Sequence, residues 1–197
     1  MSQVDDGVVK VVELIGNPRP SSRTRALADA IRRALIGELM ARAPATYETQ
    51  VLELGELVGV TFDPEPVRGR AAVADPFGPV RAARLLIVAT PTYKATYSGL
   101  LKIFLDQFSH GDLADAVAVP VAIAAAEEHR QSVQANLRDL LVELGASVPA
   151  PAVAVLEPEL ESRTVGDIAA EWVHRYGSVV ADVLRHLAHE AQAVERR

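Results

Sequence analysis

A cluster of hydroxyl, amide and guanidinium side chains follows the first apolar run of the chain. Residues 16–24 read GNPRPSSRT and directly precede a helical pattern. Backbone N–H groups and the dipole at the start of a helix favour an anion there, and hydroxyl and arginine side chains add donors. The spacing matches neither GxxxxGK[ST] nor GxGxxG. The segment therefore predicts a phosphate-monoester site, with simple helix capping by Ser22 or Thr24 as the alternative.

A second polar segment, residues 90–99, reads TPTYKATYSG. Pro91 stiffens the chain where a buried strand ends, and Tyr93 and Tyr97 offer flat apolar faces. Four side chains add polar edges: Thr92, Lys94, Thr96 and Ser98. Backbone amides in such a turn can hydrogen-bond a heteroaromatic ring, so a mononucleotide pocket is predicted beside the phosphate site. The alternative is a tyrosine-bearing turn that packs against its own helix.

The elements that must position these segments alternate along the chain. Strand-like runs lie at 8–15, 46–54, 84–90, 117–126 and 147–156, and helical patterns at 24–40, 99–108, 129–144 and 164–194. This alternation predicts an α/β fold with a parallel sheet and helices on both faces. The strand order 2-1-3-4-5 is favoured because it puts the polar second strand and the proline-containing fifth strand at the edges. Pro120 fits the fourth strand only near its start.

The order 2-1-3-4-5 also predicts where a ligand would bind. In open α/β sheets the ligand crevice lies beyond the carboxyl ends of the strands, where the strand order reverses. Here that point falls between the first and third strands. Residues 16–24 and 90–99 follow those two strands, so both segments are expected to face one crevice.

Composition excludes several classes of protein. The 197 residues include 20 basic and 26 acidic side chains, a formal charge of −6, which argues against nucleic-acid binding and attraction to anionic membranes. Cysteine is absent, which rules out disulfides and thiolate chemistry. With no long apolar run and an acidic, polar beginning, a cytoplasmic protein is expected. We expect one domain over 1–197, in which the Gly- and Pro-rich segment 55–79 forms a lid or a surface loop.

The two polar segments together resemble a known family. GNPRPSSRT and VATPTYKATYSGLLKIFLDQF are similar to the signature segments of the flavodoxin-like NAD(P)H-dependent FMN reductases, which include the reductases of two-component monooxygenases. The similarity is clear over residues 8–35 and 85–145. It implies a flavodoxin-like fold, FMN held by its phosphate at the first segment and by its ring at the second, NADH or NADPH as reductant, and a homodimer or homotetramer.

The resemblance also implies site residues and a mechanism. The phosphate would be held by Asn17, Arg19, Ser22 and Thr24, with Arg23 as a further candidate; the ring would be lined by Pro91, Thr92, Tyr93 and Lys94, while Ser98 and Gly99 shape the turn. Hydride transfer between cofactors needs no side-chain acid, so no catalytic residue is assigned. Lys102 and Asp106 are expected to form a structural pair.

The third loop departs from the family pattern. Many relatives have a Gly-Gly-type loop before a histidine, whereas residues 124–129 here read AAAEEH. Alanine disfavours positive φ, and the carboxylates of Glu127 and Glu128 would oppose an anionic reduced flavin. We therefore expect Ala125 beside the flavin and either weaker FMN binding or easier release of reduced FMN.

Other functions stay open at this level. The chain could be a quinone, azo or nitro reductase that retains FMN, or a flavin-binding or non-catalytic relative. The choice between NADH and NADPH is also open, with Arg68, Arg70 and Arg130 as candidate contacts. No metal site is predicted, because Glu127–His129 favours a solvated helix start, and His186 and His189 favour a surface pair.

Overall fold

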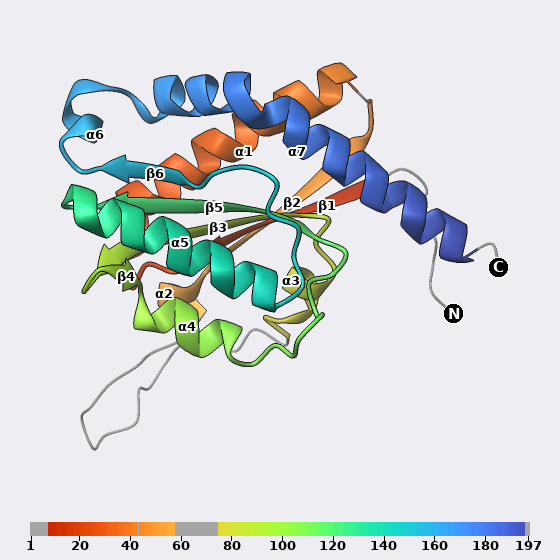
Figure 1. Cartoon of the computed structure of the whole chain (residues 1–197), viewed down its shortest axis with the longest axis horizontal. Coiled ribbons are helices and arrows are strands. Elements are labelled where there is room, and N and C mark those ends of the chain that lie inside the picture. Colours follow the sequence, from red (N-terminus) through yellow and green to blue (C-terminus); the bar gives the residue numbers. More distant parts are fainter. Residues whose placement is uncertain (1–7, 43, 58–74, 196–197) are drawn as a thin grey trace.

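The computed structural model describes residues 8–42, 44–57 and 75–195, and it contains a parallel sheet between two layers of helices (Figure 1). Its strands are β1 (Val8–Ile15), β2 (Thr46–Glu53), β3 (Leu85–Tyr93), β5 (Val117–Ala124) and β6 (Val153–Leu156), in the order β2-β1-β3-β5-β6. The two-residue β4 (Thr96–Tyr97) lies off this path and pairs with β3 antiparallel. The predicted order 2-1-3-4-5 is therefore confirmed for the parallel strands.

Helices cover both faces, as predicted (Figure 1). The long helices α1 (Arg23–Arg42) and α7 (Val165–Glu195) pack together on one face. On the other face lie α4 (Gly99–Leu105) and α5 (Glu127–Glu143). Short helices α2 (Leu54–Leu57), α3 (Gly78–Arg81) and α6 (Glu159–Ser162) complete the described part of the chain. None of the helices in the described ranges combines the length and apolarity needed to cross a bilayer.

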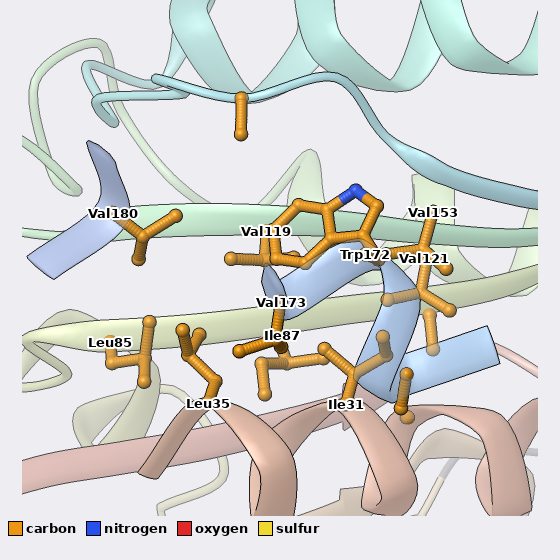
Figure 2. Close-up of a cluster of buried hydrophobic side chains, with 14 of the residues drawn as sticks. Ile31, Leu35, Leu85, Ile87, Val119, Val121, Val153, Trp172, Val173 and Val180 are labelled. Atoms are coloured by element: carbon orange, nitrogen blue, oxygen red, sulfur yellow. The ribbon is translucent and has the colours of Figure 1, made fainter. Parts of the chain in front are cut away.

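Alternation along the strands sends side chains into two separate cores. On the α1/α7 side, Leu85 and Ile87 of β3 meet α1 and α7 around Trp172 (Figure 2). The indole Nε1–H of Trp172 donates to the Pro151 carbonyl oxygen at 3.1 Å, so this residue belongs to the core. On the other side, Leu86 and Val88 pack with α4 and α5. Because successive side chains point to opposite faces, a run such as LLIVAT is apolar throughout.

Proline shapes the last two strands of the sheet. Pro120 is the fourth residue of β5, further into the strand than the position near its start at which we expect a proline to fit. Backbone N–H groups along β5 point alternately to its two neighbours: Val117 N donates to Arg84 O on the β3 side, and Ala118 N donates to Ser147 O on the β6 side. Residue 120 therefore faces the β6 side. Regular pairing with β6 begins only at Val153, so the N–H that proline lacks is not needed there. Proline is tolerated there because no ladder bond is lost.

The fifth predicted strand is shorter than expected. Ser147 makes one isolated bridge to Val117, and regular pairing resumes only at Val153. Pro149 and Pro151 lie between these points, where they cannot donate to a ladder. The predicted loop 55–79 is also bounded by helices, α2 and α3, while Arg68 and Arg70 lie outside the described residues.

Candidate functional site

The first and second polar segments meet at the carboxyl edge of the sheet, on the left in Figure 1. Ile15 and Ala89 are partners in the β1–β3 ladder, and Gly16 N donates to Ala89 O at 2.7 Å. Ser98 Oγ donates to the Gly16 carbonyl oxygen and accepts from Leu101 N at 3.1 Å. A Cβ on Gly16 would lie 2.7 Å from Leu101 Cβ. The loops are thus held together, as the sequence predicted.

The first polar segment, residues 16–24, forms a loop, called the first loop below, whose shape is set by its own side chains. Asn17 Nδ2 donates to Thr24 Oγ1 at 3.1 Å, and Asn17 Oδ1 accepts from Arg19 N at 2.9 Å. Both Asn17 and Thr24 are buried. Ser22 Oγ accepts from Arg25 N at 3.3 Å and so caps α1. Asn17, Thr24 and Ser22 therefore fix the shape of the loop around the start of α1.

The arginines of this loop differ in their partners. Arg23 Nη2 lies 3.1 Å from Glu157 Oε1, and both side chains are about half exposed. Arg19 forms no ion pair with any residue in the described ranges. An anion arriving at α1 would therefore compete with Glu157 for Arg23, but it would meet the Arg19 guanidinium without a carboxylate to displace.

The second polar segment, residues 90–99, is called the second loop below and contains a tight hairpin at the end of β3. Thr92 pairs with Tyr97, and Tyr93 with Thr96, around a turn in which Lys94 has a φ of 52° and the following alanine 66°. Two successive positive φ values define a type I′ turn, which matches the twist of the flanking strands. Tyr93 is left 45% exposed at the end of the first strand of this hairpin.

One buried polar atom in this hairpin has no partner. Thr92 Oγ1 is inaccessible to water and makes no hydrogen bond within the described residues. The neighbouring Thr90 Oγ1 accepts from Ser98 N at 3.0 Å and donates to Pro91 O at 2.8 Å, so it is satisfied. A buried hydroxyl without a partner costs about 1–3 kcal/mol. Thr92 is therefore the residue of this loop most suited to a ligand's hydrogen bond.

The third loop places acidic groups at the start of α5. The Glu127 carboxylate lies 2.7 Å from Arg130 Nη2 and accepts from Gln131 Nε2 at 3.1 Å, and these contacts lower the pKa of Glu127. Arg130 also pairs with Glu159 at 3.3 Å, so two carboxylates already hold it. Glu128 and Ala125 are exposed.

Two predicted pairs lie away from the site. Lys102 pairs with Asp106 at the end of α4, as expected. His186 and His189, expected as a surface pair, are both exposed on α7, where His186 lies 3.3 Å from Glu190. In the part of the chain that the structure describes, no group of three histidine or acidic side chains could hold a metal ion.

Residues beneath the first loop were not predicted from the sequence. Glu53, at the end of β2, accepts hydrogen bonds from Ser21 N at 3.1 Å and from Arg25 Nη1 at 3.3 Å. Glu13, inside β1, is completely buried and pairs with Arg25 and Arg32. The sequence does contain a signal for this buried pair. Glu13 is the single acid in the apolar run VVKVVELI, and the helix that follows places Arg25 and Arg32 seven residues apart, on one face.

Comparison with known proteins identifies the family. The family described as NADPH-dependent FMN reductase matches residues 9–161, more than three quarters of the chain. The chain belongs to this family. It is an oxidoreductase whose cofactors are FMN and a reduced nicotinamide nucleotide, as the resemblance implied.

Individual relatives agree with this assignment. The chain is 31% identical over 135 residues to NADH-dependent FMN reductase SfnF of Pseudomonas fluorescens (strain Pf0-1), covering 67% of this chain and 68% of the relative. An oxidoreductase structure from Corynebacterium diphtheriae has a TM-score of 0.71 and 25% identity, covering 90% and 98% of the two chains. A flavodoxin, WrbA-like protein from Agrobacterium tumefaciens, with a TM-score of 0.58, 18% identity and coverage of 91% and 98%, matches in fold. The predicted flavodoxin-like fold is thus confirmed.

The residues at the sheet edge fit FMN. An anion-attracting helix start with Arg19 and Ser22 suits the phosphate. The unpartnered hydroxyl of Thr92, beside the exposed ring of Tyr93, suits a flat polar heterocycle. The two features belong to loops that Ser98 joins, so one molecule can engage both.

Proposed function

We propose that this chain reduces FMN in the crevice between the first and second loops and passes the reduced flavin on instead of retaining it. The observation that carries the proposal is the pairing of an anion-attracting helix start with a buried, unpartnered Thr92 hydroxyl across one Ser98 bridge. Bound FMN supplies a ring that can accept a hydride from the nicotinamide nucleotide and pass electrons onward.

In this proposal the first loop holds the phosphate. Arg19 supplies an uncommitted positive charge, and the backbone N–H groups at the start of α1 supply directed donors. Asn17 and Thr24 keep those groups oriented through their mutual hydrogen bond. Arg23 assists once its pair with Glu157 opens.

The second loop orients the ring. In this proposal Pro91 and Thr92, which are partly buried, would line one side of the ring, and the exposed side chains of Tyr93 and Lys94 would shield it from water. No side chain would have to move a proton to the reacting atoms, because the cofactors themselves would supply the redox chemistry. The contribution of the chain is to hold the two rings in contact.

Release of reduced FMN is the finer part of the proposal. Ala125 lies in the third loop, where the family pattern described above has a Gly-Gly-type loop, and Glu128, three residues further on, is exposed. A negative charge at this position opposes the anionic reduced flavin. A flavin-dependent monooxygenase is the class of partner that would consume the product, and a homodimer or homotetramer is the assembly that we propose.

Nicotinamide oxidation assays test the proposal. NADH and NADPH oxidation are followed with equimolar FMN, with excess FMN, and with an added quinone. The proposal expects the rate to rise and saturate with free FMN. A rate that does not change with free FMN but rises with quinone would indicate a quinone reductase that retains its flavin. No oxidation of either NADH or NADPH would indicate a non-catalytic protein.

A pair of variants tests the phosphate loop within the same assay. Arg19→Ala should raise the KM for FMN by about 10- to 100-fold with little change in kcat, since a hydrogen bond to a charged group is worth about 1.5–3 kcal/mol. Arg33→Ala is the matched control, because Arg33 lies on α1 and pairs only with Asp29 among the described residues.

A further inference from the structure

A carboxylate lies directly beneath the first loop. Glu53 is the last residue of β2 and the ladder partner of Ile15, so it stands where the loop leaves the sheet. One oxygen, Oε2, accepts from Ser21 N at 3.1 Å. Ser21 has a φ of 52°, a backbone conformation that is uncommon outside glycine and asparagine. The hydrogen bond that Ser21 N donates to Glu53 therefore holds the loop at the residue whose backbone conformation is least favourable.

The same carboxylate is neutralised from the helix side. Glu53 Oε1 accepts from Arg25 Nη1 at 3.3 Å, and Arg25 Nε lies 3.5 Å from Glu13 Oε2. Glu13 is fully buried, and its other oxygen is held by Arg32. A series of alternating charges thus runs from the core of the sheet to the loop. Arg25 is committed to this series and is not free to reach a ligand.

The chain after Glu53 also supports the loop. A Cβ on Gly55 would lie 2.7 Å from the carbonyl oxygens of both Asn17 and Pro18. These contacts are to backbone, so they cannot be relieved by a side-chain rotation. Residues 53–55 therefore form the floor on which residues 17–21 rest.

We propose that Glu53 is a positioning residue that orders the first loop for the phosphate of FMN, with Arg25 and the buried Glu13 holding its carboxylate in place. The inference rests on the proposed function. A carboxylate repels a phosphate, so Glu53 cannot act as a ligand and acts through the backbone of Ser21. Fixing the loop before binding removes an ordering cost that the phosphate would otherwise have to meet.

The contribution is therefore specific to the phosphate. Riboflavin carries the same ring without the phosphate, so its affinity does not depend on the first loop. The ratio of riboflavin to FMN dissociation constants isolates the loop from general damage to the fold, which would weaken both flavins alike.

The experiment measures both dissociation constants by flavin fluorescence for wild type and three variants. Glu53→Ala removes the hydrogen bond to Ser21 and should weaken FMN about tenfold, the loss expected for one hydrogen bond to a charged group, while leaving riboflavin unchanged. Glu53→Gln keeps a carbonyl oxygen for Ser21 N and should restore most of the affinity. Glu56→Ala, an exposed acid on the next turn, removes the same charge without touching the loop and is the matched control.

Each result has a distinct meaning. Tighter FMN binding by Glu53→Ala would show that Glu53 acts only as an opposing charge and would overturn the inference, as would an unchanged ratio of the two flavins. Equal losses in Glu53→Ala and Glu53→Gln would overturn it too, because the carbonyl oxygen would then not suffice. If wild type binds neither flavin, the proposed function itself fails.

A second variant covers the case in which Glu53→Ala does not fold. Gly55→Ala leaves every charge in place but pushes the floor against Asn17 and Pro18. It should also weaken FMN selectively, and hydrogen exchange at the amides of Arg19 and of residues 21–23 should quicken. Retention of wild-type FMN affinity by Gly55→Ala would contradict the role that we assign to this floor.

Discussion

At the scale of single residues, Thr92 offers a test in which stability and binding change in opposite directions. Its hydroxyl is buried and unpartnered among the described residues, so it lowers the stability of the flavin-free protein. Thr92→Val keeps the shape and removes the polar atom. The free energy of unfolding without flavin should therefore stay level or rise, by at most the cost of the unpartnered hydroxyl, about 1–3 kcal/mol.

With flavin present, the same variant should bind less well. If Thr92 Oγ1 contacts the ring, Thr92→Val weakens FMN and riboflavin equally, by about five- to tenfold for one lost hydrogen bond. Denaturant unfolding and flavin titration measure the two effects. Thr49→Val, on the exposed edge strand β2, is the control. A less stable variant with unaltered flavin affinity would show that the hydroxyl serves the fold.

At the scale of elements, strands and long helices were predictable because their patterns are dominated by burial. Leu27, Ile31 and Leu35 were assigned to one stripe of a helix, and all three are fully buried. The hairpin at the end of β3 was missed because its turn, Lys94 and Ala95, lacks the glycine or asparagine that usually indicates two positive φ values.

The position of the site was predictable from the sequence, but the residues that hold the first loop in place were not. Polar residues after two buried strands indicated the crevice, since the carboxyl ends of parallel strands meet at one edge. The contact of Glu53 with Ser21 joins residues 32 apart in sequence and has no local pattern. Such long-range polar contacts become visible only when the register of β1 and β2 is known.

The third loop allows a test of flavin release at the level of an element. Arg130 balances Glu127, while Glu128 has no such partner in the described residues, so Glu128 should dominate the field at the start of α5. Glu128→Gln should tighten reduced FMN by about two- to fivefold, the effect of one charge at a few ångströms in a water-like dielectric. Anaerobic titration measures it. Glu127→Gln should have the smaller effect, and the reverse order would contradict this account.

The start of α7 gives a pH-dependent element. Thr164 and Asp167 form a capping box: Thr164 N and Oγ1 donate to Asp167 Oδ2 at 3.3 and 2.7 Å, and Asp167 N donates to Thr164 Oγ1 at 3.1 Å. The hydroxyl and amide of Thr164 lower the pKa of Asp167. A lowered folded-state pKa gives stability that is present above the ordinary aspartate pKa of about 4 and is lost as the pH falls below it.

Two variants check this capping box. Thr164→Ala should cost about 1 kcal/mol near neutral pH, a usual value for a lost helix cap. Asp167→Asn should be less stable than wild type at pH 7, and the difference should shrink as the pH falls below about 4. Thermal unfolding at a series of pH values measures both. A difference that stays constant down to pH 3 would mean that Asp167 ionisation does not stabilise α7.

At the scale of the whole molecule, the proposed FMN site lies between two loops that lead into the two layers of helices. The first loop leads into α1, which packs in the core with α7, and the second leads into α4, which packs in the opposite core. A ligand held by both loops should therefore stabilise both cores at once. At a hundredfold excess over Kd, FMN adds about 2.7 kcal/mol, which for a chain of this size raises Tm by about 5–10 °C.

Scanning calorimetry with and without FMN tests this prediction and the single domain that we expect over residues 1–197. One transition that moves as a unit is the expected result. Two transitions, of which FMN shifts only one, would contradict both a single cooperative domain and a ligand shared by the two cores. Riboflavin at the same multiple of its own Kd should give an equal shift, because stabilisation depends on occupancy and not on which loop supplies the affinity.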